Sequence, residues 1–225
     1  MDALAREFID EQITIPHQDM LPGALRGAYK RVKELSSKTD FLMTPTATYT
    51  RGHLIAWAAE FQIFCLIRDG IWPYDCEWVP YAKPTGNYLR IDTGAAFVTV
   101  SQLLDLHDGP RFAVHRFNAG LGNYPLLPFD TFAREAEEND RKHLVIGHGY
   151  QDLNFIVIGA PKPKSKKWID RTDNLLLRIA SESPLVADTG GPSPDASAVP
   201  EEGVDITIDI ELTEHLKKQM RDSNG

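Results

Sequence analysis

The sequence predicts an α+β fold, in which a helical N-terminal part packs on a mostly antiparallel sheet. Helical spacing of apolar residues dominates residues 1–70. From residue 72 onward, apolar and polar residues alternate with the period of a strand. Helices and strands that are segregated along a chain favour α+β over a parallel α/β sheet. The 225 residues are enough for one substantial domain with a buried core.

Three helices are expected in the first part of the chain. The first covers residues 3–12 and could be capped by Asp2; the second covers residues 22–38 and begins with Pro22, a residue suited to a first turn. The third is the longest and runs from residue 51 to Gly70, a natural C-cap. We expect it to be buried on most sides, through an apolar face made of Leu54, Trp57, Ala58, Phe61, Phe64 and Cys65.

Short β-branched and aromatic runs follow, separated by turn residues. The segments HLVIGHG and LNFIVIGAP are the strongest, and the tight GYQD between them predicts a hairpin or a close return. A polar helix is expected within residues 129–142. The expected strands lie at residues 72–80, 88–91, 95–104, 111–117, 143–149 and 153–161.

Composition divides the chain into three parts: a single α+β domain at residues 1–180, a flexible linker at 181–203 and a tail at 204–225. The linker is rich in Pro, Gly, Ser and acids and has no basic residue, which is typical of disorder. The tail opens with VDITIDIEL, which alternates without error, and then forms a short helix. An isolated strand is not stable in water, so this strand must pair with an edge of its own sheet or of a partner's sheet.

Charge and cysteine content limit the function classes. With 24 basic and 32 acidic residues the net charge is −8, which disfavours general duplex DNA binding. No apolar run reaches the roughly 18 residues of a membrane helix, and the acidic N-terminus is unlike a secretory signal. We therefore expect a cytoplasmic protein with no membrane contact, in which Cys65 and Cys76 are reduced thiols. No cofactor and no metal site are predicted.

Residues 143–168 contain the first candidate site. His143 and His148 are five positions apart on one strand and should lie on opposite faces, which prevents joint metal binding. His148 and Asp152 could meet across the turn, as half of a catalytic triad or metal shell, and His115 could assist. A metal-dependent hydrolase or nuclease is therefore one hypothesis. Such a pair more often tethers a loop, and no GxSxG, HExxH or Walker motif is present.

The basic segment that follows offers a second site. It places several cations around one tryptophan, a combination that can grip phosphates and stack a base. Two other interpretations account for these cations: the end of a hairpin is normally solvated and charged, or the segment docks an acidic partner surface. The candidate nucleic-acid contacts are Lys162, Lys164, Lys166, Lys167, Trp168 and Arg171.

Four stretches resemble the antitoxin family of Rosmer-type toxin–antitoxin pairs: AWAAEFQIFCLIRDGIWPYDCEWVPYAKPTGNYLRI, VTVSQ, PRFAVHRFNAGLGN and HGYQDLNFIVIGAPKP. The resemblance covers about residues 50–165, and its motifs are core and turn residues rather than reactive groups. It implies a bacterial protein without catalytic residues that binds an ImmA/IrrE-type zinc metallopeptidase carrying a helix-turn-helix domain. DNA would then be reached only through that partner. The expected partner contacts are Tyr81, Tyr88, Tyr150, Gln151, Val204, Ile206, Ile208 and Ile210.

Overall fold

The computed structural model describes residues 3–81, 86–123 and 141–182, and it has the expected α+β class. The linker and tail, the predicted helix within 129–142 and Asp2 lie largely or wholly outside these ranges. No helix in the described part of the chain is both long and apolar enough to span a membrane. Both cysteines are free thiols. The helices are α1 (Ala3–Gln12), α2 (Ile15–Gln18), α3 (Leu21–Lys38), η1 (Asp40–Met43), α4 (Pro45–Thr48), α5 (Arg51–Arg68), α6 (Val114–Leu121) and α8 (Leu175–Glu182).

In the described ranges six strands form one sheet in chain order, and all neighbours are antiparallel except the parallel pair β3–β4. This confirms the predicted mostly antiparallel sheet. The β4–β5 hairpin is confirmed too, with Ile146 opposite Ile158. The strands are β1 (Asp75–Pro80), β2 (Asn87–Asp92), β3 (Ala96–Leu103), β4 (Lys142–Gly149), β5 (Ile156–Pro161) and β6 (Trp168–Arg171).

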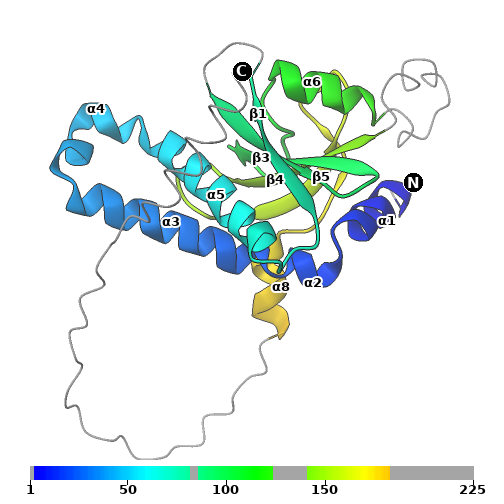
Figure 1. Ribbon diagram of the computed structural model, residues 1–225, viewed down its shortest axis with the longest axis horizontal. Coiled ribbons are helices and arrows are strands. Elements are labelled where there is room, and N and C mark those ends of the chain that lie inside the picture. Colours follow the sequence, from blue (N-terminus) through cyan, green and yellow to red (C-terminus); the bar gives the residue numbers. More distant parts are fainter. Residues whose placement is uncertain (1–2, 82–85, 124–140, 183–225) are drawn as a thin grey trace, which may run out of the picture. The chain divides into compact units, whose positions relative to one another are not determined.

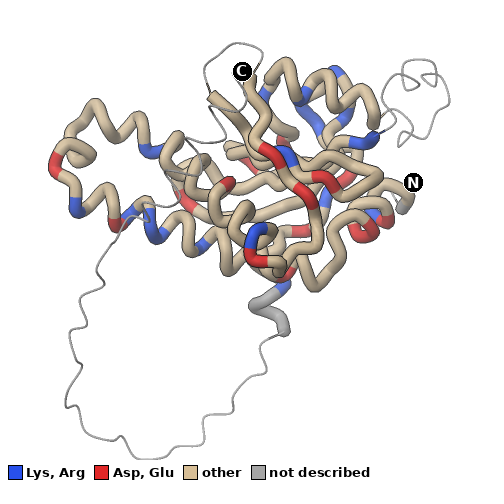
Figure 2. Tube along the Cα trace, in the orientation of Figure 1, with Lys and Arg blue, Asp and Glu red and all other residues tan. Residues whose placement is uncertain are grey.

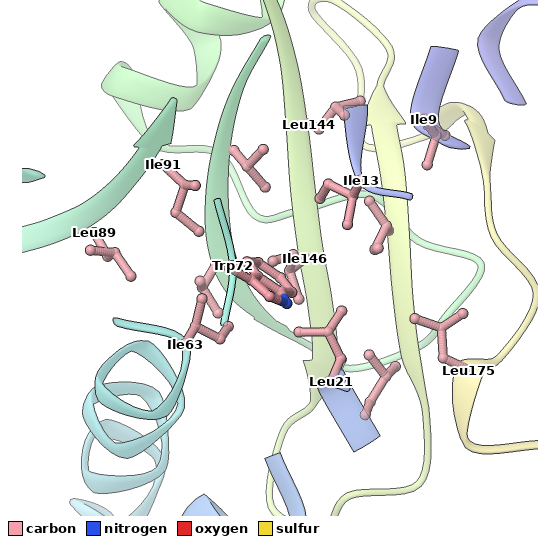
Figure 3. Packing of buried hydrophobic residues seen from close by; sticks show 14 of the residues in the cluster. Ile9, Ile13, Leu21, Ile63, Trp72, Leu89, Ile91, Leu144, Ile146 and Leu175 are labelled. Carbon is pink, nitrogen blue, oxygen red and sulfur yellow. The ribbon is translucent and has the colours of Figure 1, made fainter. Parts of the chain in front are cut away.

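The main core lies between one face of this sheet and the helices α1, α3, α5 and α8 (Figure 3). Alternate residues of each central strand enter it, such as Leu144 and Ile146 of β4, because successive side chains of a strand point to opposite faces. Trp72 is 1% exposed and lies among them, as expected for a core aromatic. The opposite face carries α6 and a smaller cluster of Leu103, Phe155 and Val157.

Two predictions about helices are wrong. Residues 111–117 were expected to form a strand, but α6 begins at Val114. The burial of the helix at 51–68 is centred on Ile55, Ala59 and Ile63, whereas Trp57 is 60% exposed. The sheet covers only one side of α5, so the long apolar stretch is not buried on most sides. Neither β6 nor α8 was expected.

Helices α3 and α5 run side by side, joined at one end by η1 and α4 (Figure 1). We call the residues from Leu35 to Trp57 at this end the hairpin tip. Five of its large apolar side chains are exposed: Leu35, Phe41, Met43, Tyr49 and Trp57. These five side chains are therefore not used in the described core, although Ile55 in the same segment is buried.

Candidate functional site

His148 lies on the core face of β4 and is fully buried. Its Nδ1 is 2.8 Å from the hydroxyl of Tyr29 on α3, and that hydroxyl donates its proton to the carbonyl of Gly149. Because the hydroxyl has only one proton, this arrangement assigns the ring proton to Nδ1, which donates to the Tyr29 oxygen. The other nitrogen, Nε2, is buried with no hydrogen-bond partner. Burial lowers the pKa of His148 to about 4, so the ring is neutral.

Asp152 does not meet His148 across the turn. Its side chain is exposed, and the turn is closed instead by the backbone: the carbonyl of Asp152 accepts from the N–H of Asn154 at 3.0 Å. That carbonyl also comes so close to Gly149 that no Cβ would fit there. The turn is thus held by Tyr29 and by a close backbone approach rather than by a His148–Asp152 pair.

His115, the third residue of the hydrolase hypothesis, is on the other face of the sheet. It stacks on Tyr88 of β2, with ring centroids 4.2 Å apart, while His148 contacts α3. Within the described ranges, no three His, Cys, Asp or Glu side chains are grouped so that they could hold a metal ion. The residues of this hypothesis are therefore not brought together.

Tyr81, Tyr88 and His115 form an aromatic stack, although Tyr81 and Tyr88 were predicted only as separate partner contacts. The two tyrosine rings lie 5.4 Å apart at 29°. Tyr81 remains 37% exposed, so one edge of the stack is accessible. The stack borders a cavity of about 260 Å³ that also reaches Thr99 and His143. Tyr150 and Gln151 are half-buried, and the Tyr150 ring faces the guanidinium of Arg111 at 5.4 Å.

Behind the stack, Glu60 of α5 is only 9% exposed. Its carboxylate accepts a long hydrogen bond of 3.4 Å from the N–H of Leu89. Burial raises the pKa of Glu60 to about 7, against the opposing influence of Leu89 N–H and of Arg116. Burial also lowers the pKa of the Arg116 guanidinium. A buried carboxyl and a half-buried arginine therefore adjoin the stack, a feature that the sequence did not suggest.

Glu60→Gln is expected to stabilise the protein at pH 8 by up to about 3 kcal/mol. Because the folded state keeps the Glu60 proton up to about pH 7 while the unfolded state loses it near pH 4.5, stability falls as the pH rises between these values. Glutamine retains an oxygen for Leu89 and has no charge to bury. Urea unfolding at pH 4 and pH 8 measures this. The exposed control Glu7→Gln should show no such gain, and equal gains in both variants would contradict the assignment.

The predicted basic segment divides into two parts. Lys162, Lys164 and Lys166 line a cavity of about 260 Å³ together with residues of α6. The Trp168 side chain instead turns inward: its Nε1 donates to the carbonyl of Leu106 at 3.2 Å, and its ring lies against Gly159. Arg171 donates to the carbonyl of Thr172. Trp168 is thus a packing residue and is not presented for base stacking.

Sequence reasoning missed two features of the surface, the hairpin tip and the full lining of the basic cavity. The hairpin tip was overlooked because Trp57 was assigned to a core face. The contribution of α6 to the basic cavity was overlooked because its segment was assigned to a strand. The residues Val204 to Ile210 lie outside the described ranges, so their predicted contacts stay predictions. Comparison of the chain with protein-family models, with curated proteins and with solved structures finds no significant match.

Proposed function

We propose that this chain is a non-enzymatic protein-binding module that acts as an antitoxin. Its partner would be a zinc metallopeptidase of the ImmA/IrrE type with a helix-turn-helix domain, as the resemblance implies. The observation that carries the binding function is the hairpin tip. Phe41 is 70% exposed, Tyr49 84% and Trp57 60%, and the end of the α3–α5 pair that carries η1 and α4 extends away from the sheet (Figure 1). Exposed aromatic residues that gather in one region typically mark an interface.

The chemistry of the tip suits a protein partner. Aromatic side chains dominate binding energy at protein interfaces because they bury a large area with few rotatable bonds. The tip contains both signs of charge, including Lys38 and Asp40, so it does not resemble a surface for a polyanion. The candidate catalytic residues do not compete with this reading, since His148 is buried and hydrogen-bonded while Asp152 points to solvent.

The test is a binding titration between the purified full-length chain and the metallopeptidase encoded beside it. The triple variant Phe41→Ser, Tyr49→Ser, Trp57→Ser should weaken binding by roughly 100-fold or more, because aromatic hot spots each contribute about 2 kcal/mol. The folded state should be little affected, since all three side chains are exposed.

A matched control is Leu104→Ser with Leu177→Ser, which removes apolar residues that are 66% and 67% exposed elsewhere. This variant should bind as the parent does. If the parent chain does not bind the metallopeptidase, the proposed partner is wrong. If the parent binds and the tip variant binds equally well, the tip is not the interface.

A further inference from the structure

The basic cavity between α6 and the β5–β6 loop has no part in the proposed protein binding. Five cationic side chains line it: Arg111, Arg116, Lys162, Lys164 and Lys166. None of its lining residues, all of which belong to the described part of the chain, is an Asp or Glu. Lys and Arg gather in and near α6 (Figure 2) although the whole chain carries a net charge of −8. Five like charges around one small space repel one another, so the cavity is electrostatically suited to an anion.

The rest of the lining is apolar and aromatic. Phe112 is 69% exposed and lies 5.6 Å from Phe117, ring centroid to ring centroid. Pro110, Pro161 and Pro163 complete this wall. An aromatic surface beside cations favours a ligand that has both a flat ring and a phosphate, because a ring can stack on phenylalanine while lysines hold the phosphate oxygens.

The lysine-bearing loop is held in place by its backbone. The N–H of Lys162 donates to the carbonyl of Lys167 at 2.9 Å, and the N–H of Gly109 donates to the carbonyl of Lys166 at 2.7 Å. Lys164 adopts φ +54°, a left-handed conformation that is costly for a residue with a Cβ. At Gly109 a Cβ would lie 3.0 Å from the backbone of Lys166, so any larger residue would push the two segments apart by a few tenths of an ångström. The loop is therefore preorganised around the cavity.

We propose that this cavity binds a nucleoside phosphate, with the phosphate at the lysines of the β5–β6 loop and the base against Phe112 and Phe117. The volume of about 260 Å³ lies just below the usual range of small-molecule pockets, which favours one nucleotide over a strand of several. This site lies outside the hairpin tip and is independent of the proposed protein partner. It uses only Lys162, Lys164 and Lys166 from the predicted nucleic-acid segment and adds α6 to them.

Calorimetric titration of the full-length protein with adenosine 5′-monophosphate, inorganic phosphate and adenosine tests the proposal. The nucleotide should bind more tightly than either fragment. Lys162→Gln with Lys166→Gln should weaken nucleotide binding roughly tenfold or more, since hydrogen bonds to charged groups contribute about 1.5–3 kcal/mol. Phe112→Ala should weaken nucleotide binding roughly fivefold or more while leaving phosphate binding unchanged, because only the base stacks.

Lys167→Gln is the matched control, since this lysine is in the same loop but does not line the cavity. It should bind the nucleotide as the parent does. An equal loss in the Lys167 variant would show a general charge effect and overturn the proposal. No binding of the nucleotide at millimolar concentration would also overturn it. Affinity that rises steadily with the length of a single-stranded oligonucleotide would replace the nucleotide site with a strand-binding surface.

Discussion

Asn123→Ala is expected to destabilise the protein by about 4 kcal/mol, a large share of the stability of a typical domain. Asn123 follows α6 and is fully buried. Its Nδ2 donates to the carbonyls of His143 and Pro161 at 2.8 and 2.9 Å, and its Oδ1 accepts from the N–H of His143 at 2.7 Å. Alanine would leave three buried backbone groups without these partners.

The reason for this arrangement lies in the β4–β5 ladder. The antiparallel register pairs Val145 with Gly159, so two residues further along it would place His143 opposite Pro161. Proline has no N–H to donate, and the regular ladder ends there. The side chain of Asn123 supplies the missing donor and also links α6 to both strands. The same residue thus positions the helix that lines the basic cavity.

Thermal and urea unfolding measure the effect. A loss of about 4 kcal/mol corresponds to a fall in Tm of roughly 10 °C for a domain of this size. Asn87→Ala, which removes an exposed asparagine at the start of β2, should change stability by less than about 0.5 kcal/mol. A fall of less than about 1 kcal/mol for Asn123→Ala would mean that water or rearranged backbone replaces its hydrogen bonds.

The parts of the fold that the sequence predicted are those with a long or repeated local signal. Helix α3 has apolar residues at helical spacing over 18 residues, and the β4–β5 hairpin combines two β-branched runs with a tight turn. In contrast, the segment RFAVHRF fits both the strand and the helix pattern. Phe112 and Val114 are two apart, as on one face of a strand, while Ala113 and Phe117 are four apart, as on one face of a helix. Short apolar segments of this kind are resolved only by tertiary contacts.

The candidate sites depended on information that is not local. The apolar stretch of α5 has more apolar residues than one face can bury, so which of them are exposed depends on where the sheet packs. Arg116 lines the basic cavity only because its segment is helical and lies beside the β5–β6 loop, some 45 residues later in the chain. Glu60 and Leu89 are brought together by the packing of α5 on β2. These contacts join residues that are far apart in the chain, so the spacing of residues along the sequence does not predict them.

Acid pH is expected to destabilise the protein through its buried histidines. His148 and His143 are both fully buried, and burial lowers the pKa of His148 to about 4 and that of His143 to about 3. The unfolded chain takes up these protons near pH 6.5 while the folded chain does not, so stability is lost as the pH falls below 6.5. Each of the two histidines should lower the free energy of unfolding by about 2 kcal/mol between pH 7.5 and pH 5. Glu60 acts in the opposite direction over this range, since its raised pKa favours the folded state at lower pH.

His148→Asn separates the contribution of His148 from the others. Asparagine can place a polar atom near the position of Nδ1 beside the Tyr29 hydroxyl, and it omits Nε2, which has no partner. The variant should be less stable than the parent at pH 7.5 because it leaves a small cavity. Its further loss of stability between pH 7.5 and pH 5 should nevertheless be smaller by about 2 kcal/mol. His53→Asn, at an exposed histidine, is the control and should keep the pH dependence of the parent.

The same measurement decides between two roles for His148. A general base or a metal ligand needs an accessible nitrogen and titrates in the range where it works. The unpartnered Nε2 is buried, and the Nδ1 proton is committed to Tyr29. If the pH dependence of His148→Asn equals that of the parent, His148 titrates alike in the folded and unfolded chains, and the hydrolase hypothesis regains its central residue. If the pH dependence of stability is reduced as expected, His148 is a neutral structural residue that links the β4–β5 turn to α3 through Tyr29.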